Sequence, residues 1–320
     1  MPAQINKAAA LLRAGELVAF PTETVYGLGA DAANPDAVAK IFAAKGRPAD
    51  HPLIVHLPDY RHLEHWAREI PVAAHALAAA FWPGPLTMIL KRQPQVSGAV
   101  TGGQDTVGLR VPGHPLALEL LSAFGGGIAA PSANRFGHVS PTTAQHVHDE
   151  LGASVAMVLD GGPCRVGIES TIVDLSGPQC RILRPGMISA ADLGRVLGYQ
   201  PETGSGKTAP RVSGSLAAHY APTTPLSLLA PNALIAAVRE ALAANQKIGV
   251  IASTACPLMD ERLIWQQAPS DASGFAHDLY ARLRELDSLG LTRILIQQPP
   301  QNEDWRAIND RLQRASQGSG

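Results

Sequence analysis

The sequence has little charge and little cysteine. Charged residues make up 17% of its 320 positions, and the formal net charge is −1 at pH 7. That balance argues against a protein that coats nucleic acid or an acidic membrane, although it is compatible with a local basic patch. Cys164, Cys180 and Cys256 are widely spaced and form no C-x-x-C pair. We therefore expect neither a structural zinc site nor a disulfide framework.

Long apolar runs are also missing. No uninterrupted run reaches about 18 apolar residues, so no membrane-spanning helix is expected. Near the N-terminus, Lys7, Arg13 and Glu16 interrupt the apolar stretch, which therefore lacks a clean signal-peptide core. These absences lead us to expect a cytoplasmic protein.

Apolar residues, glycine and proline are abundant. Apolar residues make up 46% of the sequence, enough for a sizeable core, and the length suggests two domains at about 150 residues each. The 30 glycines and 26 prolines follow no collagen-like period. They indicate many shaped turns, and such turns allow a ligand to approach the backbone closely.

Residues 1–199 alternate short apolar runs with helical patterns, which predicts an α/β domain with a mixed sheet. Asn34-Pro35-Asp36 predicts a helix start, and Gly46 predicts its end. The strands expected in this part are 17–20, 53–57, 86–90, 107–111, 128–130, 155–159, 171–175 and 181–183. The further helices expected are near 72–81, 115–124, 142–151 and 189–197.

A boundary is expected at 200–224, a linker rich in Gly, Pro, Ser and Thr. Residues 225–320 then alternate strands and helices, which predicts a small Rossmann-like α/β domain. The strands expected there are 226–229, 248–252 and 294–296, and the helices are 232–244, 274–288 and one from about 302. G-x-G-x-x-G is missing from this part, so dinucleotide binding has no support there.

The densest motif is Pro21-Thr22-Glu23-Thr24-Val25-Tyr26-Gly27-Leu28-Gly29-Ala30. We interpret it as a loop after a strand, where hydroxyls and backbone N–H groups can converge on an anion. From the local pattern alone, an ordinary strand-to-helix turn is the favoured interpretation.

Lys45-Gly46-Arg47-Pro48 follows a predicted helix and precedes a strand. The two cations are suited to cap the helix dipole, or to form a clamp for a polyphosphate held by the neighbouring Gly and Pro. His56 ends the strand Ile54-Val55-His56-Leu57, where a satisfied core histidine is the usual interpretation.

Three further segments place polar groups at turns. Ala130-Pro131-Ser132-Ala133-Asn134 follows a strand, and Ser140 before Pro141 is typical of a helix N-cap, which can also bind phosphate. Glu169-Ser170-Thr171-Ile172-Val173-Asp174 alternates as a half-buried strand does, and Arg184-Pro185-Gly186 ends the next one.

Two patterns are set aside. Gly204-Ser205-Gly206-Lys207-Thr208 is similar to a phosphate loop, but Pro201 stands where that loop requires glycine. The pairs His62 and His65, and His146 and His148, lack the H-E-x-x-H pattern, so no metal site is expected from them.

Taken together, PTETVYGLGA, KGRPADHPLIVHL, TVGLRVPGH, APSAN with Ser140, GIESTIVDL and ILRPG resemble one family in order and spacing. The chain resembles the threonylcarbamoyl-AMP synthases, the YrdC-like enzymes, in their long form with an HYAP-containing linker and a small C-terminal domain. The resemblance is most specific over about 20–190. It implies a twisted mixed sheet with helices around a concave cavity.

The resemblance also implies the reaction. L-threonine, bicarbonate and ATP are condensed into L-threonylcarbamoyladenylate, with release of pyrophosphate and water. A separate transferase complex then passes the threonylcarbamoyl group to tRNA. The substrates supply the nucleophiles, so the protein has to position them and neutralise charge.

The site residues that the resemblance implies fall into two sets. The L-threonine set is Thr22, His56, Arg110, Ala130 and Ser170. The ATP set is Lys45, Arg47, His51, Thr106, Ser132, Ser140, Arg184, His219 and Tyr220. Lys45 and Arg47 are the expected catalytic residues, with Arg47 at the phosphates, and His219 and Tyr220 are expected to fold back from the linker over the nucleotide.

Two positions depart from the family pattern, and one cofactor is implied. His51 stands where many members have asparagine, and Ser213-Gly214-Ser215 replaces a Pro-Gly-Met segment. Mg²⁺ is expected with ATP, held mostly by phosphates and water, with no metal site built from side chains.

Two alternatives remain open. The first is a module that binds double-stranded RNA, against which the net charge of −1 and the absence of a long Lys/Arg stripe count. Direct tRNA contact is compatible with the sequence but is not expected as the main interaction. The second is a related domain of hydrogenase maturation proteins, which fits poorly because the chain has no C-x-x-C pair.

Overall fold

The computed structural model describes residues 2–204, 209–214 and 216–318. The chain divides into two compact units. The N-terminal unit comprises 1–136 and 141–215, and the C-terminal unit comprises 137–140 and 216–320. The division along the chain falls inside the predicted linker. Most of the phosphate-loop-like segment, 205–208, lies outside the described residues, as does Ser215 in the Ser-Gly-Ser departure.

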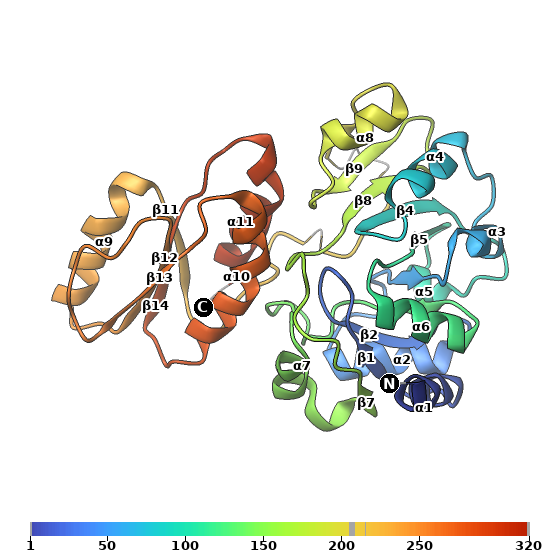
Figure 1. Ribbon diagram of the computed structural model, residues 1–320, viewed down its shortest axis with the longest axis horizontal. Coiled ribbons are helices and arrows are strands. Elements are labelled where there is room, and N and C mark those ends of the chain that lie inside the picture. The colour runs from blue at the N-terminus through green and yellow to red at the C-terminus, as the bar shows by residue number, and fades with distance from the viewer. Residues whose placement is uncertain (1, 205–208, 215, 319–320) are drawn as a thin grey trace. The chain divides into compact units, whose positions relative to one another are not determined.

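The N-terminal unit is built on a mixed sheet of ten strands, in the order β10-β9-β8-β4-β5-β3-β6-β2-β1-β7 (Figure 1). The strands are β1 (Val18–Phe20), β2 (Gly27–Asp31), β3 (Ile54–His56), β4 (Leu86–Lys91), β5 (Thr106–Arg110), β6 (Ile128–Ala129), β7 (Met157–Val158), β8 (Thr171–Asp174), β9 (Arg181–Arg184) and β10 (Glu202–Thr203). The α/β fold with a mixed sheet is therefore confirmed.

Helices surround this sheet. They are α1 (Pro2–Arg13), α2 (Pro35–Lys45), α3 (Leu63–Trp66), α4 (Val72–Phe81), α5 (Gly98–Thr101), α6 (Pro115–Phe124), α7 (Ala144–Leu151) and α8 (Ala190–Leu197), with 3₁₀ turns at Tyr60–His62 and Gly152–Ser154. The apolar faces of α1 and α6 form one buried cluster with Phe20 of β1 and Ile128 of β6. A larger cluster fills the rest of the core, from Leu28 in β2 to Leu193 in α8.

The α2 helix shows how local sequence sets an element. The Asn34 side chain accepts from the N–H groups of Asp36 and Ala37, and Pro35 occupies the first helical turn. Gly46 ends the helix with φ of 62°, a left-handed conformation that glycine adopts without steric cost. The predicted start and end are both confirmed, and Lys45 is placed in the last turn.

One prediction here is wrong. Residues 21–30 were predicted to be a loop, but Gly27–Asp31 forms strand β2, paired antiparallel with β1 and β6. Glycine is depleted in strands, so the pattern hides the element. A Cβ on Gly29 would lie 2.8 Å from the Phe20 ring and 2.9 Å from an Ile128 methyl. The close packing of the sheet therefore requires this glycine.

The C-terminal unit has a four-stranded parallel sheet in the order β11-β14-β12-β13. Its strands are β11 (Leu226–Leu229), β12 (Ile248–Ala252), β13 (Leu263–Gln267) and β14 (Arg293–Gln297), and its helices are α9 (Pro231–Ala243), α10 (Ala272–Asp287) and α11 (Arg306–Gly318). In Figure 1, α9 lies on one side of this sheet and α10 and α11 on the other. This is the expected Rossmann-like layout.

Strand β13 was not predicted. Its sequence Leu-Ile-Trp-Gln-Gln lies at the edge of the sheet and is half-buried to exposed. An edge strand tolerates polar side chains, so its apolar pattern is weak. None of the helices in the described part of the chain is long and apolar enough to span a membrane.

Candidate active site

Two parallel neighbours, β3 and β5, end side by side. His56 and Arg110 are their last residues and pair directly in the sheet register. On the other side of β3, the N–H of Ala130 donates to the Ile54 carbonyl at 2.9 Å. The structure therefore brings together three residues of the predicted threonine set through strand pairing.

Arg110 is held by a buried ion pair. Its Nη2 donates to Glu23 Oε1 at 2.7 Å and to Thr24 Oγ1 at 3.0 Å, and its Nε donates to the Gly84 carbonyl at 3.3 Å. The other Glu23 oxygen accepts from the N–H of Gly113 at 2.8 Å. The side chains of Arg110 and Glu23 are only 5% and 4% exposed. Their pairing satisfies two charges that would be costly to bury alone.

Glu23 and Thr24 were not assigned by sequence reasoning. The available signal was the acid in the Thr-Glu-Thr pattern, because a carboxylate at a buried position requires a cation. Thr22 orders the same loop. Its hydroxyl donates to the Val25 carbonyl at 2.6 Å and lies 2.8 Å from Thr24 Oγ1. The loop thus positions hydroxyl groups beside Arg110.

His56 is neutral at pH 7. Burial, with a smaller contribution from the Arg110 charge, lowers the pKa of His56 to about 3. The Phe20 ring meets the imidazole edge to face, with 5.9 Å between ring centroids. A neutral imidazole beside the guanidinium can take part in hydrogen bonds without adding a second positive charge.

Lys45 links two of the sequence motifs. Its Nζ donates to the carbonyl of Ser132 at 2.6 Å and to the carbonyl of Asn134. Burial, and then the Arg47 charge, hold the pKa of Lys45 well below its ordinary value. The end of α2 is thereby fixed against the Ala-Pro-Ser-Ala-Asn segment, which brings predicted ATP residues from both motifs together.

Arg47 is also enclosed. Its Nη2 donates to the Pro52 carbonyl at 3.0 Å and to Ser213 Oγ at 3.2 Å, and its Cζ lies 5.7 Å from the centre of the Phe136 ring. The His51 ring meets the same phenylalanine edge to face at 5.2 Å. Burial, and next the Arg47 charge, lower the pKa of His51. His51 therefore lies beside Arg47, on the same aromatic ring.

Arg184, at the end of β9, holds Ser170 and the linker. Its Nη2 and Nε donate to the hydroxyl and carbonyl of Ser170, both at 3.1 Å, and its Nη1 donates to the Ser213 carbonyl at 3.0 Å. Ser170 Oγ lies 2.8 Å from Thr87 Oγ1. Two predicted ATP-site cations, Arg47 and Arg184, thus converge on one linker residue, Ser213.

Val212, the linker residue before Ser213, packs against one face of the sheet. Val212 packs against Ile54, Ile89 and Ile172. Thr106 lines the space that remains, a cavity of about 10 Å³. Sequence reasoning did not assign Val212 or Ser213 to the site. Two guanidinium groups beside a polar loop form an arrangement that can hold phosphate oxygens once the loop gives way.

Three residues of the predicted ATP set belong to the C-terminal unit. They are Ser140, His219 and Tyr220. The Ser140 carbonyl accepts from Arg284 Nε at 3.4 Å. The Tyr220 ring lies 4.1 Å from the His219 ring and stacks on Tyr280 at 5.9 Å. Their contact with ATP stays a prediction.

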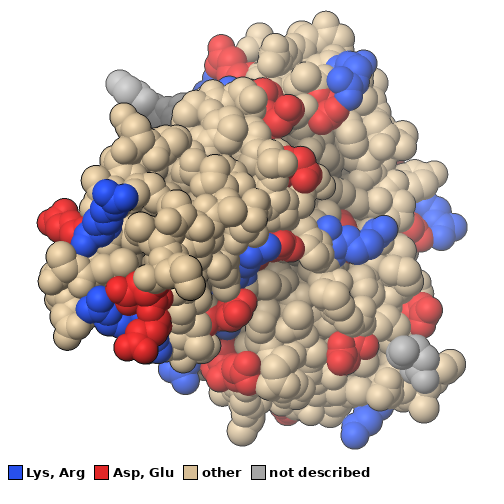
Figure 2. Space-filling model, turned by 60° about the vertical axis from the view of Figure 1, so that its left-hand side comes forward, with Lys and Arg blue, Asp and Glu red and all other residues tan. Residues whose placement is uncertain are grey.

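Metal ligation and surface charge can be compared with the expectations from the sequence. In the part of the chain that the structure describes, no group of three His, Cys, Asp or Glu side chains is placed to hold a metal ion. Figure 2 shows basic and acidic side chains interspersed over one face of the molecule. Interspersed charge of both signs does not favour that face as a surface for RNA.

Two family models match successive parts of the chain, and the boundary between them lies about 28 residues before the one between the two compact units. A family model described as "Telomere recombination" matches residues 10–186, and one described as "Threonylcarbamoyl-AMP synthase, C-terminal domain" matches residues 188–317. The chain is similar to the threonylcarbamoyl-AMP synthase of Pyrococcus abyssi, with 39% identity over 98% of this chain and 94% of that protein. The Bacillus subtilis threonylcarbamoyl-AMP synthase is 40% identical, over 98% and 93%.

Solved structures agree with these matches. The crystal structure of P. abyssi Sua5 complexed with L-threonine has a TM-score of 0.91 at 36% identity, covering 100% of this chain and 97% of that one. E. coli YciO, at 25% identity and a TM-score of 0.52, covers 58% of this chain and 90% of its own. The similarity to Sua5 thus extends through both units, whereas YciO shares only part of the chain.

Proposed function

The chain belongs to the threonylcarbamoyl-AMP synthase family, and we propose how its residues perform that synthesis. The family assignment rests on similarity over nearly the whole chain. The enzyme is a nucleotidyltransferase that makes threonylcarbamoyl-AMP. The observation that carries the residue assignment is the meeting of a buried Arg110 with His56 at two strand ends, beside a second cluster around Arg47 and Arg184.

Threonine binds at Arg110 in this proposal. Glu23, Thr24 and Gly84 accept from Nη2 and Nε, and no described residue accepts from Nη1. That nitrogen is available to donate to the substrate carboxylate. Because Glu23 balances the charge and fixes the guanidinium plane, recognition depends on geometry as well as on charge. The L-threonine complex of P. abyssi Sua5 supports threonine as the substrate.

ATP binds at the second cluster, where Arg47 and Arg184 hold phosphate oxygens. Both guanidinium groups now donate to Ser213, whose hydroxyl and carbonyl offer them neutral acceptors. A phosphate oxygen is a stronger acceptor, because charge-assisted hydrogen bonds are shorter and stronger than neutral ones. Linker segment 211–213 therefore has to yield when the nucleotide binds. His219 and Tyr220 would follow as a cover that keeps water from the adenylate.

The chemistry needs no protein nucleophile. The threonine nitrogen forms a bond to the carbon of bicarbonate, and water leaves as the carbamate forms. A carbamate oxygen then attacks the α-phosphorus of ATP, and the bond to pyrophosphate breaks. Lys45 and Arg47 stabilise the charge that develops on the phosphates. Mg²⁺ would accompany ATP and help to neutralise the phosphate charge, held mostly by the phosphates and water rather than by side chains of this protein.

The product carries a reactive mixed anhydride. A separate transferase complex uses it to modify adenosine in tRNA, so the partners of this chain are its three substrates and that acceptor system. A cytoplasmic location suits such a reaction, because ATP and tRNA are both available there.

The direct test measures pyrophosphate released from ATP by the full chain. We expect release to require both L-threonine and bicarbonate, and to fall to background when either is withheld. Release that is indifferent to threonine would contradict the proposal. Double-stranded RNA binding that weakens steeply with salt, without threonine-dependent turnover, would favour the RNA-binding alternative.

A further inference from the structure

The C-terminal unit contains a cavity of about 410 Å³ whose lining includes none of the residues proposed to bind threonine or ATP. Most of its lining lies at the carboxyl ends of the four strands: Pro231 after β11, Ser253 after β12, Pro269 and Ser270 after β13, and Gln297, the last residue of β14, with the segment 298–301 that follows it. This volume lies within the range of small-molecule pockets, about 300–1,000 Å³. The cavity therefore lies at the carboxyl ends of a parallel sheet.

The position within the sheet is also specific. Strands β11 and β14 are neighbours, but α9 leaves one and α11 leaves the other toward opposite faces (Figure 1). In open α/β sheets, ligands bind outside the carboxyl ends of the strands where the connections diverge in this way. Pro231 and Gln297 lie on the two sides of this divergence and both line the cavity.

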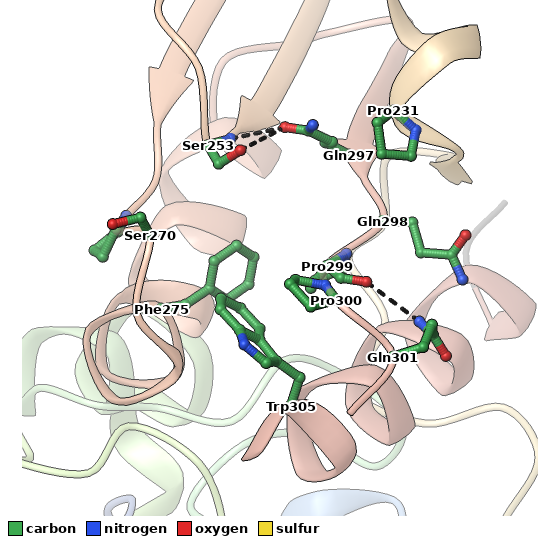
Figure 3. Close-up of a pocket in the computed structure, with 11 residues that line it drawn as sticks. Pro231, Ser253, Ser270, Phe275, Gln297, Gln298, Pro299, Pro300, Gln301 and Trp305 are labelled. Atoms are coloured by element: carbon green, nitrogen blue, oxygen red, sulfur yellow. Dashed lines mark hydrogen bonds between the residues drawn. The ribbon is translucent and has the colours of Figure 1, made fainter. Parts of the chain in front are cut away.

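The lining is aromatic and amide-rich. Phe275 and Trp305 meet edge to face with 5.4 Å between ring centroids, and both are buried. In Figure 3 these two rings lie on one side of the cavity, and Ser253 and Gln297 lie on the other. Aromatic and proline surfaces of this kind suit a flat ring.

The amides offer complementary groups. Gln297 Oε1 accepts from the N–H and hydroxyl of Ser253 at 2.9 and 3.0 Å, and no described residue accepts from its Nε2. Gln301 Nε2 donates to the Pro299 carbonyl at 3.3 Å and to Asn309 Oδ1 at 2.8 Å, and no described residue donates to its Oε1. Each of these two lining amides thus keeps one group that bonds to no described residue, a donor on Gln297 and an acceptor on Gln301.

The charges argue against phosphate. None of the lining residues is charged. Three acidic residues adjoin the lining in sequence, namely Asp271 after Ser270, and Glu303 with Asp304 before Trp305. The cation that follows Trp305, Arg306, is ion-paired with Glu303 at 2.8 Å. A phosphate group would find no cation in the lining and would meet negative charge nearby. The lining therefore favours a neutral ligand.

We propose that this cavity binds a purine nucleobase or nucleoside without phosphates. Its ring lies against Phe275 and Trp305, and its edge pairs with the amides of Gln297 and Gln301. The site is separate in chemistry from the proposed ATP site, where Lys45, Arg47 and Arg184 provide the charge. It would let the C-terminal unit respond to a nucleoside rather than to a nucleotide.

The test is isothermal titration of the full-length chain with adenosine, after a non-hydrolysable ATP analogue and L-threonine have saturated the N-terminal site. We expect saturable binding, with AMP at least several-fold weaker than adenosine. Ser270 is an exposed residue of the lining, and the indole ring introduced by Ser270→Trp would occupy the cavity. This variant should therefore weaken adenosine binding at least tenfold. Ser273→Trp places the same ring on an exposed position of α10 outside the lining and should change nothing.

A second pair of variants addresses the amides. Gln301→Ala removes one of the two amides proposed to pair with the base, whereas Gln313→Ala makes the same change on the exposed side of α11. The first should weaken adenosine binding and the second should not. The proposal is overturned by absence of adenosine binding, by loss of that binding when the ATP analogue is present, or by equal binding in Ser270→Trp and Ser273→Trp. Pyrophosphate release, measured in parallel, reports separately on the synthesis.

Discussion

The two units place their polar groups differently. The N-terminal unit buries Glu23, Arg110, Lys45, Arg47 and Arg184 around its candidate active site. The cavity of the C-terminal unit is lined by aromatic, proline and amide side chains without a single charge. Buried charge is costly unless it is paired. The N-terminal unit thus buries charge at the site that we propose for its charged substrates, whereas the lining of the C-terminal cavity offers uncharged groups, which favours a neutral ligand.

The largest effect is expected from the phosphate-binding cations. Arg47→Ala and Lys45→Ala should each raise the activation free energy of adenylate formation by about 2–4 kcal/mol, because charge compensation at the phosphates is lost. The measurement is pyrophosphate release by variants whose circular dichroism matches the parent chain. Lys7→Ala, at an exposed position of α1, is the matched control. Near-normal turnover of both folded variants would remove the phosphate role.

Arg110→Lys should have the next largest effect. Lysine keeps the charge but loses the planar fork that now bonds Glu23, Thr24 and Gly84. Threonine affinity should fall at least tenfold, with a smaller change for ATP, as measured by titration with each ligand. Arg61→Lys, at an exposed position, should alter neither affinity. An equal loss for both ligands would contradict the assignment to threonine.

His56 predicts a pH dependence of stability. Its pKa of about 3 in the folded state lies below the ordinary value of 6.5, so below pH 6.5 the unfolded chain binds the extra proton first. The free energy of unfolding should therefore decrease as the pH is lowered from 6.5 to 3. This group contributes a decrease of up to about 1.4 kcal/mol per pH unit. Urea unfolding of the parent chain and His56→Gln should show the shallower slope in the variant. Identical slopes would mean that His56 is not held neutral.

A smaller effect, on the stability of the linker segment, is expected from Val212, which packs against the sheet. Val212→Ala removes two methyl groups from the contact with Ile54, Ile89 and Ile172, which should destabilise the closed segment by about 1–1.5 kcal/mol. Amide hydrogen exchange over 209–214 should then be faster, while exchange in β4 and β5 is unchanged. Unaltered exchange in 209–214 would show that Val212 does not hold the segment down.

The smallest effect on the synthesis is expected from a variant in the cavity of the C-terminal unit. Gln298 lines that cavity and is not among the residues proposed to bind ATP or threonine, so Gln298→Ala tests whether the cavity contributes to the synthesis. Pyrophosphate release should stay within about twofold of the parent chain. A loss comparable to that of Arg47→Ala would mean that the cavity contributes to the synthesis and that the two sites are not separate.

Sequence by itself determined the elements whose signals are local. Caps such as Asn34 and Gly46 operate within one helical turn, and apolar periods of two or 3.6 residues are visible in short windows. Strand patterns therefore placed His56 and Arg184 at strand ends, where the structure has them, whereas Arg110 was assigned only through the resemblance that the joint order of six motifs indicated. Local patterns failed at β2, where glycine hides a strand, and at β13, where an exposed edge weakens the apolar pattern.

Tertiary structure alone decided which groups meet. Glu23 and Arg110 are separated by 87 positions, and Arg47 and Ser213 by 166, so no local pattern records either contact. The same holds for Ser140, His219 and Tyr220, which join the C-terminal unit through contacts made far along the chain. A buried charge is specified by its partner and its loss of solvent, and both exist only after the chain has folded.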